Sequence, residues 1–190
     1  MANRAGPLIH YTLDASASQF TAQITGPRAG TLSTPARRFS IDDFTGYAVL
    51  GREVCEGSKI QISINPRSLS RMDHLAARER EPNGLGAFDD ILEIEKHPKI
   101  TFEGAQASAS GNGEGRYRVV IDGNLTVRGL TRPLAIETHI LYGEDSFRAY
   151  GDFQLRPADF GVNGDLYAKL LAQAAGHVTF VYFITGRKEN

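Results

Sequence analysis

The chain lacks any apolar run long enough to cross a bilayer. A membrane-spanning helix needs roughly 18 or more apolar residues in a row, and no stretch of the 190-residue sequence meets that length. The first seven residues, Met1 to Pro7, also lead into strand-like sequence without the apolar segment of a secretory signal. With Met1 as the true start, we expect a cytoplasmic protein with no transmembrane segment.

An excess of charge of one sign is also lacking. Lys and Arg total 21 against 22 Asp and Glu, which gives a net charge of −1. Proteins that bind nucleic acid or anionic membranes usually concentrate basic residues on one face. Because the two signs are interspersed here, we expect no nucleic-acid partner.

Cysteine is nearly absent. Cys55 stands alone in the sequence, so an internal disulfide is excluded and the fold must hold without one. A chain of this length fits a single domain, residues 1–190, that buries about 70% of the surface its unfolded form exposes. We expect residues 1–7 to be a flexible N-terminus.

What the sequence has instead is alternation of apolar and polar residues, which predicts half-buried strands. The pattern begins at Leu8, pauses at the small residues 15–18 and resumes at Phe20, which indicates one long strand with a kink or bulge. The last strand, 177–185, is apolar on both faces, which predicts a covered outer surface or a homodimer contact. The most regular of the other alternating segments are 59–64, 117–128, 134–140 and 147–155.

These segments predict an all-β protein of about eight antiparallel strands joined mainly by hairpins. A sheet of that size without protected edges tends to close into a barrel. An eight-stranded barrel is either filled by side chains or wide enough for one slender ligand.

One region, residues 66–97, interrupts the alternation. Ser68 is placed to cap a short helix that begins at Leu69, and a second helical turn from Ala87 reaches Leu92 before Pro98 stops it. We expect this region to form a helical cap and loop over the barrel. Residues 165–175 also have a helical pattern.

Four segments resemble motifs of the YceI-like family of polyisoprenoid-binding, lipocalin-like proteins. They are Tyr11-Thr-Leu-Asp14 through Phe20, Leu92 to Phe102, Gly123-Asn-Leu-Thr-Val-Arg-Gly-Leu-Thr-Arg-Pro133, and Phe153-Gln-Leu-Arg-Pro-Ala-Asp-Phe-Gly-Val162. Their order and spacing cover most of residues 9–186.

The resemblance implies an extended eight-stranded antiparallel lipocalin-like β-barrel closed at one end by helix. Its apolar lumen would hold the chain of a polyisoprenoid, an isoprenoid quinone or a similar amphiphilic lipid. Members of the family are commonly exported and often dimeric. This sequence departs from the pattern because it shows no signal peptide and because its segment 71–88 is longer.

A lumen for such a ligand needs a long apolar lining. Burial of a five-carbon isoprene unit gains roughly 4 kcal/mol gross, whereas association costs roughly 4 to 15 kcal/mol. Three to five buried units would therefore give micromolar affinity. The residues that we predict to bind ligand, each of which has simple core packing as its alternative role, are Phe20, Phe39, Ile62, Phe88, Ile91, Leu92, Phe102, Ile121, Phe153, Phe160 and Phe180.

Candidate polar groups are few. Asp73 and His74 adjoin the predicted helix, but neighbours on a helix point about 100° apart and do not form a catalytic dyad, so a surface or head-group contact is the alternative. No histidine has the spacing of a metal site. Arg128 and Arg132 flank a turn and fit either a phosphate head group or solvated turn charges.

The sequence therefore predicts a non-enzymatic protein that binds, transports or sequesters a lipid, without a metal or a cofactor other than that ligand. The alternative is an enzyme, an isomerase or cyclase, that uses the barrel as a reaction chamber for an apolar substrate. The alternative requires a cluster of polar side chains inside the lumen.

Overall fold

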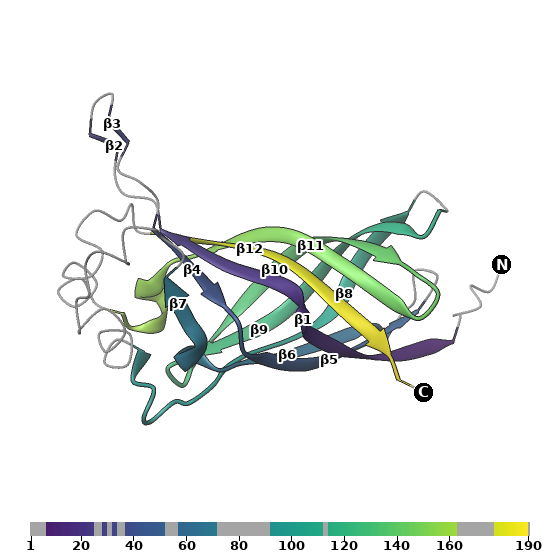
Figure 1. The fold of residues 1–190 in the computed structure, drawn as a ribbon, viewed down its shortest axis with the longest axis horizontal. Coiled ribbons are helices and arrows are strands. Elements are labelled where there is room, and N and C mark those ends of the chain that lie inside the picture. Colours follow the sequence, from purple (N-terminus) through teal and green to yellow (C-terminus); the bar gives the residue numbers. More distant parts are fainter. Residues whose placement is uncertain are drawn as a thin grey trace.

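The computed structural model describes residues 7–24, 28–29, 32–33, 37–51, 57–71, 92–111, 114–162 and 177–189. Strands make up most of these residues (Figure 1). None of the described segments is a helix long and apolar enough to cross a membrane. The elements are β1 (Leu8–Ile24), β2 (Arg28–Ala29), β3 (Leu32–Ser33), β4 (Arg37–Ile41), β5 (Phe44–Gly51), β6 (Lys59–Ile64), the 3₁₀ helix η1 (Pro66–Ser68), β7 (Leu69–Arg71), β8 (Ile100–Gly111), β9 (Arg116–Val127), β10 (Leu130–Tyr142), β11 (Ser146–Leu155), the 3₁₀ helix η3 (Pro157–Phe160) and β12 (Val178–Lys188).

Eight antiparallel strands close into an elongated barrel, as predicted (Figure 1). Neighbouring strands follow the order β12, β11, β10, β9, β8, β6, β5 and β1, and β1 pairs again with β12 to close the ring. Closure leaves no free edge in the ring, which is how such a sheet avoids pairing with other chains. At one end of the barrel, β4 and β7 extend the wall beside β1.

The strand β1 runs the length of the barrel and contains the predicted bulge. Asp14 pairs with Thr185 and Gln19 with Phe183, so the four residues 15–18 of β1 stand opposite the single residue Ile184 of β12. The three extra residues are an odd number, so they reverse which positions face inward. Tyr11 before the bulge and Phe20 after it are therefore both buried inside the barrel.

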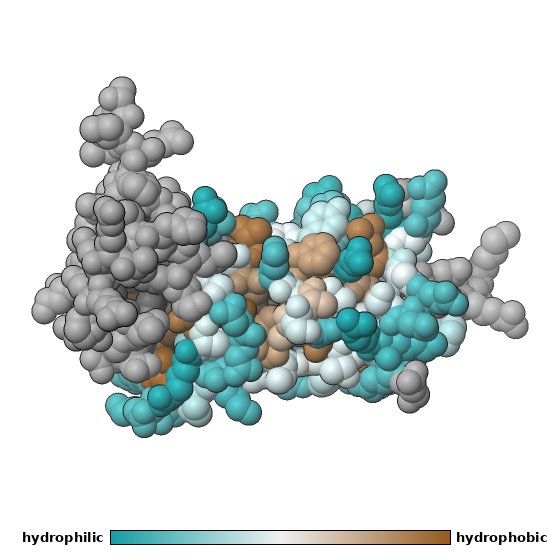
Figure 2. Space-filling model, viewed as in Figure 1, coloured by the Kyte–Doolittle hydropathy of each residue, from teal (hydrophilic) through white to brown (hydrophobic). Residues whose placement is uncertain are grey.

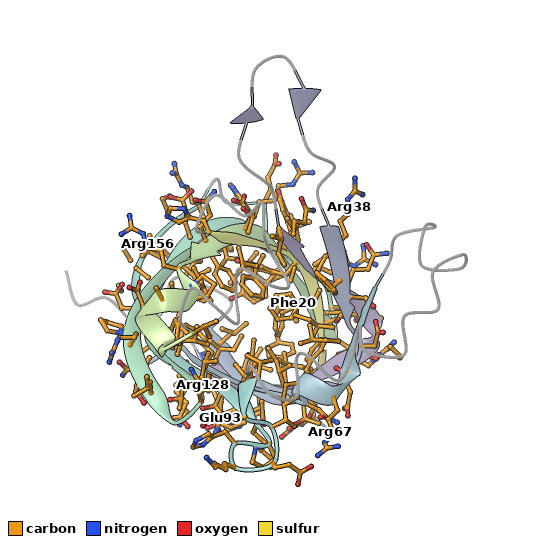
Figure 3. The ribbon with its side chains drawn as sticks, turned by 90° about the vertical axis from the view of Figure 1, so that its left-hand side faces the viewer. Phe20, Arg38, Arg67, Glu93, Arg128 and Arg156 are labelled. Atoms are coloured by element: carbon orange, nitrogen blue, oxygen red, sulfur yellow. The ribbon has the colours of Figure 1, made fainter. Side chains whose placement is uncertain are left out.

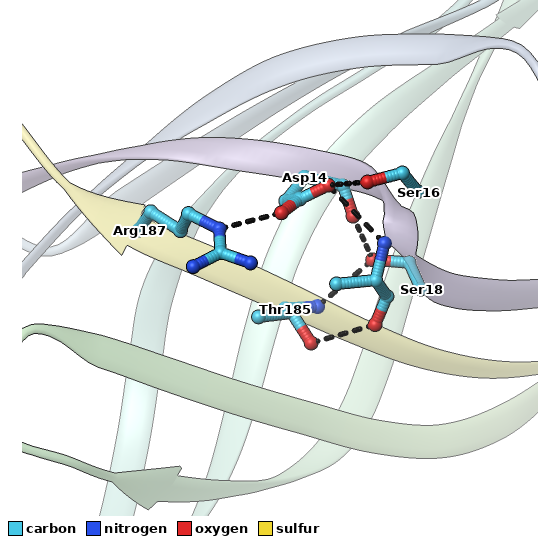
Figure 4. A network of polar contacts seen from close by, with 6 residues as sticks. Asp14, Ser16, Ser18, Thr185 and Arg187 are labelled. Carbon is cyan, nitrogen blue, oxygen red and sulfur yellow. Dashed lines mark hydrogen bonds and ion pairs between the residues drawn. The ribbon is translucent and has the colours of Figure 1, made fainter.

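Side chains satisfy the backbone that the bulge removes from the strand ladder (Figure 4). Asp14 accepts hydrogen bonds from Ser16 Oγ at 2.6 Å and from Ala17 N at 3.1 Å. Across the seam, Thr185 donates its N–H to Ser18 Oγ at 3.0 Å and its hydroxyl to Ala17 O at 2.9 Å. The bulge is thus held by a defined network, and it fixes the inward position of Phe20.

The predicted helix at Ser68 is wrong for the residues described there. Asn65 caps η1 by accepting from Arg67 N at 3.1 Å, and Ser68 Oγ donates back to Asn65 O at 2.8 Å instead of capping a following helix. From Leu69 the backbone is extended and forms β7 on the edge of β4. The edge of β4 offers backbone partners, and pairing with them overrides the weak helical pattern.

The second predicted helical turn, from Ala87 to Leu92, falls within the described residues only at Leu92. Leu92 is helical, but Glu93 has a φ of 49° and a turn follows through Lys96. The rest of the predicted cap, residues 72–91, lies outside the described residues, and so does the predicted helix 165–175. Phe88, Ile91, Asp73 and His74 belong to these segments, and Cys55 also lies outside the described ranges.

Two hairpins join β8 to β9 and β9 to β10, and the second turn is shorter than the sequence suggests because residues 130–133 already belong to β10. β8 ends at Gly111 and β9 begins at Arg116, and the pair β9–β10 is joined by Arg128 and Gly129 alone. Both residues of this two-residue turn have positive φ, 52° and 71°. A type I′ hairpin turn requires positive φ at both positions, because only then does its twist match that of the strands.

The outer face of β12 is apolar, as its sequence predicts. Val181 is 39% exposed and Phe183 is 37% exposed, and Tyr150 of β11, which pairs with Phe183, is 40% exposed. Figure 2 shows hydrophobic side chains between polar ones on this side of the barrel. The homodimer that we predict from this strand stays a prediction.

Candidate ligand-binding lumen

The described residues line two apolar cavities inside the barrel. The first, here called the central chamber, has a volume of about 90 Å³ and is lined by residues such as Ile62, Ile121 and Phe147. The second, the end chamber, has a volume of about 160 Å³ and lies at the end that carries β4, β7 and η3. Their linings are almost entirely apolar, which suits a hydrocarbon ligand.

Every described member of the predicted ligand-binding set lines at least one chamber. Ile62, Phe102 and Ile121 line the central chamber. The residues of the set that line the end chamber alone are Phe39, Leu92, Phe160 and Phe180, and those that line both chambers are Phe20 and Phe153. Contact of these side chains with a ligand stays a prediction, and Phe88 and Ile91 lie outside the described residues.

The sequence reasoning missed several lining residues. Tyr182 lies two residues after Phe180 on the same face of β12, so its position in the alternation could have identified it. Ile136 and Ile140 of β10 follow the same rule. Leu69 lines the end chamber from a strand, and its helical assignment concealed the direction of its side chain.

Phe20 stands between the two chambers. Its ring lies 6.3 Å from Phe44 and 6.4 Å from Tyr182, with interplanar angles of 86° and 77°. It also meets Phe180 at 6.0 Å and Phe153 at 6.5 Å. Figure 3, which looks into the barrel from the end that carries the end chamber, shows Phe20 near the middle of the ring of strands.

Inward-facing glycines let large rings lie along the barrel wall. A Cβ on Gly123 would come within 2.6 Å of the Phe102 ring, and one on Gly186 would come within 2.1 Å of the Phe147 ring. These rings occupy space that an eight-stranded barrel would otherwise leave open. The lumen is therefore divided and narrow instead of being one wide tunnel.

Buried polar side chains in the central chamber are satisfied by backbone. Thr138 Oγ1 donates to Tyr150 O at 3.3 Å, and Tyr182 donates its hydroxyl to Glu137 O at 3.4 Å. Burial raises the pKa of Tyr182 to about 12, so its phenol is neutral at physiological pH. Neither group is placed to exchange protons with a ligand near neutral pH.

Arg128 ties together three segments beside the end chamber. Its Nη2 donates to Glu93 Oε1 at 2.9 Å, and its Nη1 donates to the carbonyl oxygens of Phe160 and Gly161. The hydrogen bond from Arg128 to Glu93 lowers the pKa of the Glu93 carboxyl below its ordinary value. The Arg128 side chain is only 18% exposed, so its interpretation as a solvated turn charge is wrong, whereas contact with a head group stays a prediction.

Arg132 is an exposed charge of the same turn, as one of its two interpretations predicts. Its Nε donates to Asp159 O and its Nη1 to Thr131 O, each at 3.0 Å. Both arginines of the β9–β10 hairpin therefore hold backbone carbonyl groups in place. In the part of the chain that the structure describes, no cluster of His, Cys, Asp and Glu has the arrangement of a metal site.

A sequence profile described as the YceI-like domain matches residues 11–181 of the chain. A UPF0312 protein from Shewanella sp. strain W3-18-1 is 28% identical over 151 residues, which cover 76% of this chain and 71% of the relative. A second UPF0312 protein, from Shewanella oneidensis, is 30% identical over 131 residues, which cover 66% of this chain and 63% of the relative.

Solved structures show the same architecture. BcnA of Burkholderia cenocepacia superposes with a TM-score of 0.66 at 16% identity and covers 91% of this chain and 98% of its own. A polyisoprenoid binding domain from Saccharophagus degradans, implicated in plant cell wall breakdown, gives a TM-score of 0.67 at 12% identity, with 95% and 99% covered. At these identities the likeness establishes the fold.

Proposed function

This chain belongs to the YceI-like domain family, and we propose that its lumen binds the hydrocarbon chain of a polyisoprenoid, an isoprenoid quinone or a similar amphiphilic lipid. The observation that carries the proposal is the pair of apolar chambers that follow one another along the barrel axis. A structural relative is named as a polyisoprenoid binding domain, which supports the same ligand class.

The polarity of the lumen sets the direction in which such a lipid binds. The polar atoms of Thr138 and Tyr182 already bond to backbone carbonyls, so the central chamber offers a polar head group little compensation for its lost hydration. At the end-chamber side, charged side chains such as Arg38, Arg67 and Arg156 surround the barrel (Figure 3). We therefore place the head group at this rim and the hydrocarbon tail inside.

The chambers are small when their side chains rest as observed. An apolar cavity of about 150 Å³ holds one benzene molecule, which has six carbons. By this measure the end chamber, at about 160 Å³, holds about one five-carbon isoprene unit, and the central chamber holds less. A ligand with three to five buried units must therefore displace side chains between the chambers.

The lining favours a carrier over an enzyme. An isomerase or cyclase needs an acid, a base or a stabilising dipole aimed at the substrate. The polar residues of the described lining are Ser58, Lys59, Gln106, Thr138 and Tyr182. Lys59 is exposed, Ser58 accepts from Gly51 N, and Thr138 and Tyr182 direct their hydroxyls at backbone carbonyls. Burial raises the pKa of Tyr182 to about 12. We propose that the protein carries or sequesters its lipid without changing it.

Substitutions that fill the chambers test this proposal. Ala22 lines the end chamber and Ala149 lines the central chamber, so Ala22→Leu and Ala149→Leu each add three carbons to one of them. Ala135→Leu makes the same change on the outer face of β10, where the side chain is exposed. We expect farnesol, measured by isothermal titration, to bind roughly tenfold more weakly to each filled variant.

The control separates the lumen from the surface. Ala135→Leu should bind farnesol as the unsubstituted protein does. Equal affinity in all four proteins, or weakening by Ala135→Leu alone, would place the ligand outside the lumen and contradict the proposal.

A further inference from the structure

We infer that Phe20 is a movable partition that sets the length of hydrocarbon chain the lumen accepts. The inference rests on the proposed function, because it concerns the same lumen. With the ring in its observed place a chain ends in the end chamber, and with the ring displaced the chain continues into the central chamber.

The position of Phe20 supports this role. Of the residues that the structure describes, four line both chambers, namely Phe20, Ile64, Leu125 and Phe153. Phe153 lies flat against Phe180, with ring centroids 5.1 Å apart and planes 9° apart, so it is packed as part of the wall. Phe20 instead makes edge contacts at steep angles, and Figure 3 shows it near the middle of the lumen.

The backbone around Phe20 shows why this ring is the adjustable one. The bulge ends at Ser18, regular pairing with β12 resumes at Gln19, and Phe20 follows directly after it. It has an apolar chamber on each side, so a change of rotamer moves its ring into space that is already free of atoms. The ring of Phe147, by contrast, borders the central chamber alone, so it has free space on that side but does not separate the two chambers.

The chamber volumes explain how the partition selects chain length. The end chamber alone accommodates about one isoprene unit by the benzene measure. Removing the Phe20 ring joins it to the central chamber and adds the volume of the ring itself. Longer chains then bury isoprene units that the divided lumen leaves outside, whereas short chains bury few additional units and gain little affinity.

A competition experiment tests the inference. The protein is incubated with an equimolar mixture of geraniol, farnesol and geranylgeraniol, which have two, three and four isoprene units, and the bound alcohols are quantified by mass spectrometry. We expect Phe20→Ala to raise the ratio of bound geranylgeraniol to bound geraniol roughly tenfold. Phe20→Leu keeps more bulk for folding and should raise the ratio by a smaller factor.

Phe147→Ala is the matched control. It removes the same atoms from a buried ring that lines the central chamber alone, so it enlarges the lumen without opening the partition. It should leave the ratio within about twofold of the unsubstituted protein.

Two results would contradict the inference, and they differ in what else they contradict. In the first, the unsubstituted protein binds these alcohols, but Phe20→Ala and Phe20→Leu leave the ratio of bound geranylgeraniol to bound geraniol unchanged, or Phe147→Ala raises that ratio as much as Phe20→Ala does. This result refutes the partition and leaves the proposal of lumen binding intact. If the unsubstituted protein binds none of the three alcohols, the proposed function fails and the partition fails with it.

Discussion

Asp14 shows how one half-buried carboxylate on the outer side of the wall supports the inside of the barrel. It binds Ser16 Oγ, Ala17 N and Arg187 Nε, and these residues hold the bulge that turns Phe20 into the lumen. The hydrogen bonds from Ser16 and Arg187 lower the pKa of Asp14 from 3.8 to about 2. The carboxylate form is therefore favoured in the folded state.

This pKa shift predicts a pH-dependent contribution to stability. Because the folded pKa is the lower one, the contribution is complete above about pH 4 and is lost as pH falls toward 2. Asp14→Asn should lower the midpoint of urea unfolding at pH 6, and the difference from the unsubstituted protein should shrink at pH 2.5. A difference that is the same at both pH values would show that the charge does not stabilise the bulge.

Some of these side-chain roles could be read from the sequence and others could not. Alternation assigns an inward direction to Phe20 and Phe153 because the period of a strand is two residues. It does not reveal that the bulge contains three extra residues, so that odd-numbered positions of β1 face inward before it and even-numbered positions after it. The role of Arg128 was also hidden, because its partners Glu93 and Phe160 are distant in sequence and meet only in the folded barrel.

Among the elements, the β9–β10 hairpin not only joins two strands but also holds two other segments beside the end chamber. Its turn residue Arg128 holds the turn at Glu93 and the end of η3 at Gly161. Leu92 and Phe160, which line the end chamber, are neighbours of these contact points. The hairpin therefore fixes one side of the chamber wall.

Replacing Arg128 tests this link. Arg128→Gln keeps the long side chain and the positive φ of the turn but removes the charge and most of the donors. We expect a loss of about 1.5 to 3 kcal/mol in the free energy of unfolding, as for buried hydrogen bonds to a charged group. Denaturant unfolding followed by circular dichroism measures the loss.

Arg132→Gln is the control for this substitution. Arg132 is exposed and contacts backbone carbonyls at the same hairpin, so its loss should cost less than about 1 kcal/mol. Equal losses of unfolding free energy in the two variants would mean that the hydrogen bonds of Arg128 to Glu93 and Gly161 contribute no more to stability than those of Arg132.

The helix predicted to begin at Leu69 is wrong for a reason that lies in the elements around it. Leu69 has a position on a helical stripe, but the edge of β4 offers backbone hydrogen bonds that a three-residue strand can use at once. Local spacing carries no information about such an edge. The barrel strands were predicted well because each one carries its own alternation, whereas β7 depends on a partner.

Over the whole molecule, barrel closure and apolar lining follow from the same alternation. Every described residue predicted to bind ligand lines a chamber, since any inward residue of a narrow barrel meets its lumen. The division of the lumen could not be predicted, because it depends on how rings such as Phe102 lie over inward glycines. Ring orientation is a property of packing, and alternation does not specify it.

The most direct test of the proposed function is native mass spectrometry of freshly purified protein. If the lumen holds a lipid, the folded protein should be heavier than the 20.7 kDa polypeptide by the mass of an isoprenoid compound. Extraction with organic solvent should release that compound. A mass equal to the polypeptide alone, together with no uptake of added farnesol, would contradict the account.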